Sequence, residues 1–543
     1  MRKTWILVMA TAAAAIAGCS REQAMEAPVS PTIRAGFEVP TRVAFSDEGV
    51  FSWKEGDAIG VPYTKADNSA ARMDFALTAG AGAAQGEFTT SDDVTLLGTD
   101  PIGVVPASAL DVANAEAPIK LPASYAWAEG QSNAVMVATG LKLSGMNTFK
   151  HVGGIVKVTY KNIPADADGF LLSADAGICG NFALQDGVIV AGPTANHVKV
   201  TFTAGTASEM AFYVPVPTGE YKLTASLTRD GYSLPGTKKQ TSAPVKIARK
   251  TLLLMDALTS ENPEPVTVTI STAEDLKSFL ADADKLGRGS KMVLAADIDA
   301  GTITPAEAFY GDVDGKGFKI TYQEEIPEAG SDSYSGLFGY IDGSVKNLKV
   351  AGTVKTGAIK NGGIAAESAP GALFENCESD VDIRMEVNGV STPKLSGIVA
   401  VAGDGTTIKD CKNTGDIAYV LDGKPAGRST QIGGIVANVT NHVDVINCIN
   451  EGELRYEALG TPRIGGMIGY LNDPVNIVLS SCVNRGHVVS DINWTSGYVY
   501  IGGITGYVGT NTDPALPVEQ VLFMNCANYG KVESLVPAMK EPS

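Results

Sequence analysis

The C-terminal part of the sequence repeats one short phrase six times, and this repetition limits the folds open to the chain. In chain order the phrases are NLKVAGTV, NCESDVDI, DCKNTGDI, NCINEGEL, SCVNRGHV and NCANYGKV. Each follows a glycine-rich apolar phrase: GLFGYI, GGIAA, SGIVAV, GGIVAN, GGMIGY and GGITGY. The second residues of the six phrases, Leu348, Cys377, Cys411, Cys448, Cys482 and Cys526, are 29, 34, 37, 34 and 44 residues apart. Periods of this length are typical of solenoids.

Fixed positions inside the repeat predict how one coil is built. Four phrases carry Asn two residues after the Cys and Gly four residues after it: Asn413, Asn450, Asn484, Asn528, and Gly415, Gly452, Gly486, Gly530. Asn and Gly tolerate left-handed backbone, so we expect a corner at these positions. Asn side chains stacked in successive coils can also hydrogen-bond to one another. The GGI phrase predicts the other strand of the coil, with Gly where strands bend or approach closely.

The six repeat phrases resemble the GLUG-type repeats of bacterial surface adhesins, and this resemblance implies a right-handed parallel β-helix of about six or more coils. The likeness covers about residues 334–532. The coil around Cys377 departs from the pattern with Ser379 and Val381, and the first coil departs from it with Leu348. Insertions fall on one edge of the solenoid, in 418–430, 455–463, 487–500 and 509–520, and such edges often carry binding.

The repeat cysteines have three interpretations. Equivalent residues on stacked parallel strands lie about 4.8 Å apart with side chains pointing the same way, which favours a reduced ladder in the core. Disulfides are the second interpretation, because exported proteins meet oxidising compartments. A metal site is the third, although zinc spacings such as C-x₂-C are absent. We expect the six positions from Leu348 to Cys526 to be structural core, with no metal and no cofactor.

Chain length limits the number of domains, and net charge limits the class of partner. A chain of 543 residues is too long for one ordinary core and predicts two to four domains. Its net charge of −18 argues against nucleic acid as a partner, because phosphates require an excess of Lys and Arg.

The N-terminus has the pattern of a bacterial lipoprotein signal, which we place at residues 1–18. Arg2 and Lys3 precede a short apolar stretch that ends in Ile-Ala-Gly-Cys19 and resembles a lipobox. This predicts cleavage before Cys19, acylation (palmitate among the acyl chains), and a surface-exposed address on the outer membrane. An ordinary signal peptide with an incidental Cys is the alternative. Residues 19–32 then form a flexible tether.

Residues 33–258 alternate in the manner of short strands separated by turn residues, which predicts β-sandwiches. TRVAFSD, FSWKEGDAIGV and FKHVGGIVKVTY occur in the order found in the fimbrillin family (major fimbrial subunit and Mfa-like lipoproteins), which this region resembles. The resemblance implies two transthyretin-like sandwiches, 33–147 and 148–258. It also implies trimming after an arginine, for which Arg34 and Arg42 are the candidates, and strand exchange with other fimbrial subunits. Both arginines can equally be plain surface residues.

Residues 259–267 are proline-containing and predict a linker to the β-helix domain, 268–543. Ser271 to Glu274 has a capping-box pattern, and the apolar residues Leu276, Phe279, Leu280 and Ala283 follow at helical spacing. We therefore expect one short helix that covers the open end of the solenoid. Asp312 and Asp314 could be calcium ligands, but the stretch around them does not match an EF-hand loop. We therefore favour a structural turn here.

The sequence predicts a binding protein rather than an enzyme. The four His are scattered, and Asp382, Asp416 and Glu453 fall at equivalent repeat positions that favour a solvated acidic stripe. We find no pattern of a catalytic nucleophile or phosphate loop. The favoured function is a lipid-anchored adhesin, or an accessory or tip component of a fimbrium, whose β-helix binds a host glycan or protein. The alternative is a β-helix polysaccharide lyase or glycosidase on the same stalk.

Overall fold

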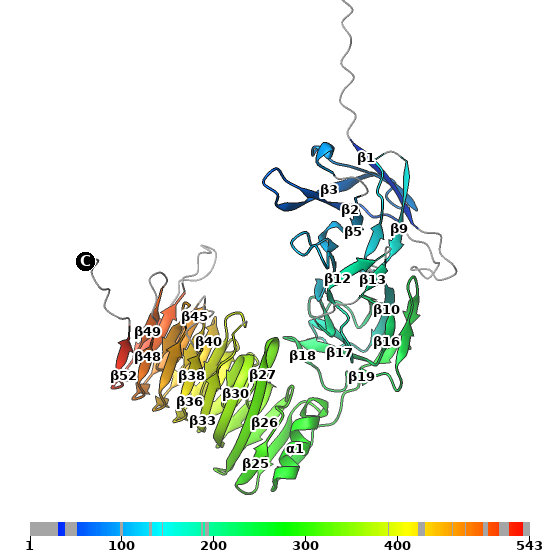
Figure 1. Cartoon of the computed structure of the whole chain (residues 1–543). Helices are drawn as coiled ribbons and strands as arrows, with labels where there is room; N and C mark the ends of the chain where they lie inside the picture. The colour runs from blue at the N-terminus through cyan, green and yellow to red at the C-terminus, as the bar shows by residue number, and fades with distance from the viewer. Residues whose placement is uncertain are drawn as a thin grey trace, which may run out of the picture. The chain divides into compact units, whose positions relative to one another are not determined.

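The structure is a computed structural model of the chain, shown in Figure 1. It describes residues 31–37, 52–97, 101–129, 133–143, 145–185, 188–190, 195–388, 390–421, 429–458, 460–472, 474–491, 498–509 and 521–535. The chain divides into two compact units. The first comprises residues 1–120, 135–152 and 183–190, and the second comprises 121–134, 153–182 and 191–543.

A closed barrel forms the first unit, with strand order β1-β4-β3-β2-β5-β8-β9. Its strands are β1 (Thr32–Phe37), β2 (Ala58–Thr64), β3 (Ala70–Ala79), β4 (Gln85–Thr89), β5 (Gly103–Val105), β8 (Met136–Ala138) and β9 (Met146–His151). Trp53, from the FSWKEGDAIGV phrase, is buried in the core of this unit. Its ring contacts those of Phe37 and Phe88 at centroid distances of 4.4 and 4.8 Å, and such aromatic contacts stabilise a core beyond their buried area.

The second unit begins with two mixed sheets of orders β15-β10-β21 and β18-β17-β11-β14-β7, in which β21 and β7 pair in parallel and the other strands pair antiparallel. Their strands are β7 (Ser124–Ala126), β10 (Gly154–Lys161), β11 (Gly169–Ala174), β14 (His197–Thr201), β15 (Glu209–Val216), β17 (Leu223–Arg229), β18 (Tyr232–Ser233) and β21 (Leu252–Leu254). The smaller strands β16 (Gly219–Tyr221), β19 (Lys239–Gln240), β20 (Val245–Ile247) and β22 (Leu258–Thr259) also belong to this unit. Three further short strands, β6 (Ile119–Leu121), β12 (Gly180–Gln185) and β13 (Val188–Val190), lie wholly or partly in segments of the first unit. We call the 153–258 part of the second unit the second β-module. Its transthyretin-like character stays a prediction.

The remainder of the second unit is a parallel β-helix, as the repeats predict (Figure 1). Three sheets run along it, and each strand pairs in parallel with its equivalents in the neighbouring coils. One sheet contains β23 (Thr267–Ile270), β24 (Ser290–Leu294), β26 (Gly311–Asp314), β29 (Ser344–Lys346), β32 (Leu373–Glu375), β36 (Thr406–Lys409), β41 (Val443–Ile446), β46 (Ile477–Ser480) and β51 (Val521–Met524). The shortest sheet contains β28 (Phe338–Ile341), β31 (Ala365–Ser368), β35 (Val399–Ala402), β40 (Val436–Thr440), β45 (Ile468–Asn472) and β50 (Thr505–Val508).

The third and largest sheet holds sixteen of the described strands. They are β25 (Ile298–Thr302), β27 (Lys319–Ser335), β30 (Lys349–Gly362), β33 (Glu378–Met385), β34 (Lys394–Ser396), β37 (Lys412–Asn413), β38 (Ile417–Val420), β39 (Gln431–Gly433), β42 (Ile449–Asn450), β43 (Leu454–Glu457), β44 (Arg463–Gly465), β47 (Val483–Asn484), β48 (Val488–Ser490), β49 (Tyr500–Gly502), β52 (Ala527–Asn528) and β53 (Val532–Ser534). The coils extend upstream of the first repeat phrase, because β23 already pairs with β24.

The predicted cap helix is present as α1 (Ala273–Asp282) at the start of the β-helix (Figure 1). The capping box lies one residue later than predicted. Thr272 is the N-cap and Asp275 accepts from its backbone N–H, so the pair is Thr272 and Asp275 rather than Ser271 and Glu274. Leu276, Phe279 and Leu280 are buried in the β-helix core as expected, which closes the end of the apolar interior.

The asparagines form the predicted ladder. Asn450 Nδ2 donates to Asn484 Oδ1 at 2.8 Å, and Asn450 Oδ1 accepts from Asn413 Nδ2 at 2.9 Å. The ladder continues from Asn484 to Asn528. Each side chain also donates to the carbonyl of the Gly two residues on, as Asn450 does to Gly452 at 3.0 Å. Most buried amide groups along the stack are thereby paired, and the exception among the described residues is Oδ1 of Asn413, at the start of the ladder.

The chain bends at the four repeat Gly as predicted, but the left-handed backbone predicted at the Asn and Gly positions lies elsewhere. The left-handed residue is the one before the Cys or Leu, with φ between 51° and 56° at Asn347, Asn376, Asp410, Asn447, Ser481 and Asn525. The Gly of the repeat serves close packing instead, because a Cβ on Gly452 would collide with the carbonyl oxygen of Gly415 in the coil before. The left-handed conformation and the close approach of neighbouring backbones therefore fall on different residues of the repeat.

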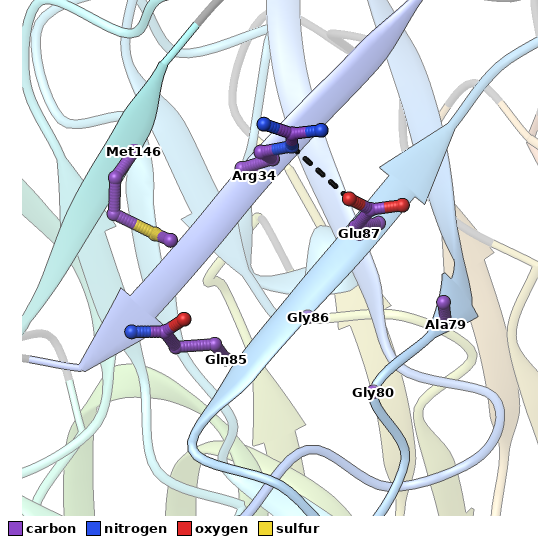
Figure 2. A pocket seen from close by; sticks show the side chains of 7 residues that line it. All are labelled: Arg34, Ala79, Gly80, Gln85, Gly86, Glu87 and Met146. Carbon is purple, nitrogen blue, oxygen red and sulfur yellow. Dashed lines mark hydrogen bonds and ion pairs between the residues drawn. The ribbon is translucent and has the colours of Figure 1, made fainter.

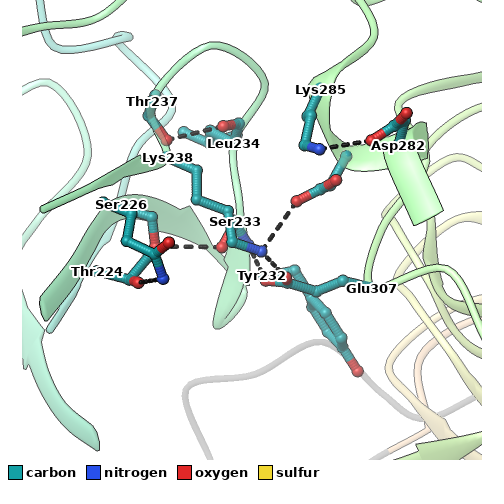
Figure 3. Close-up of polar contacts among 12 residues, drawn as sticks. Thr224, Ser226, Tyr232, Ser233, Leu234, Thr237, Lys238, Asp282, Lys285 and Glu307 are labelled. Atoms are coloured by element: carbon teal, nitrogen blue, oxygen red, sulfur yellow. Dashed lines mark hydrogen bonds and ion pairs between the residues drawn. The ribbon is translucent and has the colours of Figure 1, made fainter. Parts of the chain in front are cut away.

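Within the second unit, the second β-module is attached to the β-helix by charged and aromatic contacts. Figure 3 shows Lys238 donating to Glu307 at 2.7 Å, and the same ammonium reaches Asp284 at 3.1 Å. Burial raises the pKa of Glu307, but Lys238 and Ser233 lower it by more, so the net pKa lies below the ordinary value and the carboxylate stays charged. Residues of the predicted linker are held as well, since Ser260 N–H donates to the Lys161 carbonyl.

Candidate functional site

Several of the sequence-predicted site residues lie outside the described residues. These are Cys19, the predicted lipidation site, and Arg42, one of the two predicted processing sites. Most of the predicted edge insertions also fall there, namely 422–428, 459, 492–497 and 510–520. Lipidation and the roles of these insertions therefore stay predictions.

Arg34, the other predicted processing site, lies in the middle of β1 with its side chain on the outside of the barrel (Figure 2). Its Nε donates to Glu87 Oε1 at 3.0 Å, beside a pocket of about 350 Å³ lined by Gln85, Gly86 and Met146. The residues on either side, Ile33 and Ala35, point into the core, and β1 is paired with both β4 and β9. Arg34 is therefore an exposed side chain on a backbone that is fully engaged in the sheet.

The repeat cysteines and Leu348 line the interior of the β-helix. Leu348, Cys377, Cys411, Cys448 and Cys482 are buried, Cys526 in the last coil is partly buried, and all five sulfurs are unbridged. Burial raises the pKa of Cys411 and Cys448, while a hydrogen bond with Cys411 together with burial raises that of Cys377. A protonated, buried thiol is a poor nucleophile and metal ligand. Their redox state in the exported protein stays a prediction.

The predicted acidic stripe is a hydrogen-bonded column. Asp382 Oδ1 accepts from the Asp416 backbone N–H at 2.9 Å, and Asp416 Oδ1 accepts from that of Glu453 at 2.7 Å. His487, at the next equivalent position, lies 3.4 Å from Glu453 and 2.8 Å from Glu533. The carboxylates therefore join successive coils, which is a structural role.

Asp312 and Asp314 belong to β26 rather than to the predicted turn, which follows at Lys316 and Gly317. Asp312 accepts hydrogen bonds from the backbone and hydroxyl of Ser344, and Asp314 accepts from Asn347. In the described part of the chain, no group of three or more His, Cys, Asp or Glu is arranged to hold a metal ion. No helix there is long and apolar enough to span a membrane.

Four tyrosines of the last coils, one exposed and three partly exposed, gather around one arginine. We call Arg463, Tyr470, Tyr498, Tyr500 and Tyr507 the tyrosine–arginine face. The Arg463 guanidinium lies 4.8 Å from the centre of the Tyr470 ring and 5.4 Å from that of Tyr507. Tyr500 contacts Tyr507 at a centroid distance of 4.5 Å and stacks on Tyr498 at 6.1 Å. Tyr498 is 71% exposed. Tyr and Arg are the residue types most enriched at binding hot spots.

Register in the β-helix explains why these residues meet. Gln431, Arg463 and Tyr500 are paired residues on β39, β44 and β49, next to core residues Ile432, Ile464 and Ile501 that point inward. A second column on the shortest sheet passes through Asn438, Tyr470 and Tyr507. The two columns face each other across the bend of the GGI phrase. The recurring Tyr in GGMIGY and GGITGY was the sequence signal for this face, but the sequence interpretation did not use it.

The same two columns contact the second β-module at their other end. Tyr340 occupies the same position as Tyr470 and Tyr507, four and five coils earlier, and its ring stacks on that of Tyr232 at 4.6 Å. Tyr232 donates to Glu367 at 3.0 Å, and the Lys360 ammonium lies 5.3 Å from its ring. One end of this surface therefore already binds an aromatic group of the same chain.

No protein-family model matches the chain, and no curated protein matches it. Among solved structures, a candidate cell adhesion protein from Bacteroides fragilis aligns with 41% of this chain and 89% of its own, at 12% identity and a TM-score of 0.26. The C-terminally truncated tip fimbrial protein Mfa3 from Porphyromonas gingivalis aligns with 42% of this chain and 97% of its own, at 11% identity and a TM-score of 0.20. An IgA1 protease aligns with 71% of this chain and 30% of its own, at 13% identity and a TM-score of 0.32. Likenesses this low establish neither family nor function, so the class of this protein, an all-β chain with a parallel β-helix, rests on its own strands.

Proposed function

We propose that the chain is a surface-exposed adhesin of the outer membrane, anchored through lipid on Cys19, or an accessory or tip component of a fimbrium. In this proposal the β-helix binds the ligand, a host or other glycan or a protein. The observation that carries the proposal is the tyrosine–arginine face. Exposed rings stacked around a cation offer large, rigid contact area at low entropic cost, as in known binding surfaces.

The tyrosine–arginine face is continuous with an interface in the same chain, and this supports its assignment as a ligand-binding surface. The two columns bind Tyr232 of the second β-module at Tyr340, Lys360 and Glu367. The equivalent positions in the last coils carry the same residue types, Tyr and a cation, and their rings are partly or largely exposed. A surface that already holds an aromatic group at one end is suited to hold a ligand at the other.

The attachment of the β-helix also suits display of a ligand site. Arg229 donates to Asp342 at 2.8 Å and Lys238 bridges Glu307 and Asp284, so charges from both parts neutralise each other at the junction. Bonds of this kind, in which both partners are charged, are stronger than neutral ones. The β-helix is thereby presented as a fixed extension of the second β-module.

A ligand array tests this function. The full chain, solubilised in detergent, is applied to arrays of glycans and matrix proteins, beside the double variant Tyr498→Ser, Tyr507→Ser. We expect the native chain to retain at least one ligand and the double variant to bind it at least about tenfold more weakly, because hot-spot aromatics dominate affinity. Tyr529→Ser is the matched control, since Tyr529 is 75% exposed in the last coil but outside the face.

Two results would contradict the adhesin proposal. One is that the native chain retains no ligand, or that all three proteins bind alike. The other is the release of reducing ends or unsaturated sugars from a glycan, which would establish the alternative of a carbohydrate-active enzyme.

We further propose that removal of β1 opens the barrel for strand exchange with another subunit. β1 lies between β4 and β9, and its place would present two rows of unpaired backbone groups. Cleavage after Arg34 would leave half of β1 in place, whereas cleavage after Arg42 would detach the whole strand, because Arg42 follows Phe37 in the chain.

Protein released from the cell surface is therefore expected to begin at Val43, as N-terminal sequencing would determine. Arg42→Ala should abolish this start, while Arg34→Ala, the control, should leave it unchanged. A protein that begins only at Cys19 would exclude trimming, and one that begins at Ala35 would place the cut inside β1.

A further inference from the structure

A short cationic strip overlaps the tyrosine–arginine face of this acidic protein and extends onto the coils before it. Lys394, Gln431, Arg463 and Tyr500 are paired residues on successive coils, about 4.8 Å apart per coil. The facing column on the shortest sheet consists of Val401, Asn438, Tyr470 and Tyr507. These eight positions contain two cations and no carboxylate, although the whole chain has a net charge of −18. We call them the cationic strip.

The cations of the strip lack anionic partners among the described residues. The Glu367 carboxylate acts on Lys394 electrostatically but is already paired with Lys360. Lys394 donates only to the Thr392 carbonyl at 3.3 Å. Burial, together with the positive charge of Lys360, lowers the pKa of Lys394, as expected for a cation without a counter-charge.

Two polar atoms of the strip are buried without a hydrogen-bond partner in the described structure. They are Nε of Arg463 and Oε1 of Gln431, on neighbouring coils. Most buried polar groups in proteins are paired, so each orphaned atom requires an explanation. The Arg463 guanidinium stacks on Tyr470 and Tyr507, and stacking occupies its faces while leaving its N–H groups available.

The chemistry of the strip favours a sugar chain over a protein. Its polar groups are amides, an ammonium, a guanidinium and phenols, and Val401 is the one aliphatic residue among the eight. Protein partners are held mainly by apolar anchors in a desolvated centre. A sugar offers hydroxyls to the amides and an apolar ring face to the tyrosines. A polysaccharide also repeats one unit along its length, as the coils do.

We propose that the cationic strip binds a carboxylate-bearing polysaccharide, with the sugar carboxylates at Arg463 and Lys394 and the sugar rings against Tyr470, Tyr500 and Tyr507. This inference rests on the proposed adhesin function and names its ligand class. A carboxylate at Arg463 would receive the two parallel hydrogen bonds for which a guanidinium is shaped.

Binding of the full chain to polygalacturonate, alginate and hyaluronan tests the inference, each compared with its methyl ester. Esterification removes the charge and keeps the sugar chain. We expect the native chain to bind at least one polyuronate at least about tenfold more tightly than its ester, and binding to weaken as salt is raised. Arg463→Gln and Lys394→Gln should each lower the affinity at least about tenfold, and Arg463→Lys should lower it less.

Arg485→Gln is the matched control, because Arg485 is an exposed arginine of the next coil that pairs with Glu451 away from the strip. Unchanged affinity in this variant supports the assignment. Equal binding of acid and ester, or no binding to any of the three polyuronates, would overturn the inference even if all variants fold. A protein or neutral glycan retained on the array would then leave the adhesin function standing. Binding of dextran sulfate with no polyuronate bound would also overturn the carboxylate assignment.

Discussion

Replacing Glu324 by glutamine is expected to make the β-helix progressively more stable than the native protein as the pH rises from 5 to 8. Glu324 on β27 is 4% exposed and lies inside the coil, where burial raises the pKa of its carboxyl to about 8. The backbone N–H of Gly336 donates to one oxygen at 2.9 Å, and the other oxygen has no partner among the described residues. This single hydrogen bond is too weak to offset burial.

The direction of the pH effect follows from proton binding. Between the ordinary pKa of about 4.3 and the folded pKa of about 8, the folded protein holds a proton on Glu324 that the unfolded chain has released. Stability therefore falls as pH rises through this window, by about 3 kcal/mol between pH 5 and pH 8. Glutamine does not titrate, so the stability difference between the two proteins should grow by that amount.

Urea unfolding of both proteins at several pH values measures the effect. The quantity of interest is how the difference in unfolding free energy between the two proteins changes with pH. The buried glutamine amide adds the same amount to this difference at every pH, so its contribution cancels. Glu325→Gln is the control, since Glu325 is the next residue of β27 and is exposed. A stability difference that stays constant from pH 5 to pH 8 would mean that Glu324 is ionised in the folded protein.

Features set by local backbone and pattern could be predicted from the sequence. The repeat period gave parallel coils, the apolar spacing after Thr272 gave the cap helix, and the recurring Asn gave the ladder that the structure shows. In each case the residues that cause the feature are close in sequence or occur once per coil. Residues that are close in sequence, or that recur once per coil, can therefore be interpreted from the local pattern and the repeat period alone.

Features set by neighbours in other coils could not be predicted in the same way. Glu324 follows the strand pattern of its neighbours, and only the coil that encloses it makes it buried. The left-handed residue was predicted at the wrong position because Asn and Gly suit both a left-handed backbone and close packing, and sequence alone does not separate the two. Arg463 and Tyr470 lie one coil before Tyr498, Tyr500 and Tyr507, so the tyrosine–arginine face depends on the register of β44, β45, β49 and β50.

The asparagine ladder leads to the second prediction, that Asn450→Leu destabilises the β-helix by about 3–5 kcal/mol. Asn450 is fully buried, donates to Asn484 and to the Gly452 carbonyl, and accepts from Asn413. Leucine has a similar branched shape, so the change removes hydrogen bonds more than it removes volume. Buried groups on the coils above and below lose their partners, and each unsatisfied group costs about 1–3 kcal/mol.

A second asparagine in the same coil provides the matched control. Asn447 is the left-handed corner residue, and its side chain donates to Asp410 at 2.6 Å on the exposed surface. Asn447→Gly keeps the backbone conformation open and is expected to change stability by no more than about 1 kcal/mol. Urea unfolding compares the two variants with the native chain. If both cost the same small amount, the ladder fixes the register of the coils without stabilising them, and the core of Leu348 and the five cysteines then holds the stack together.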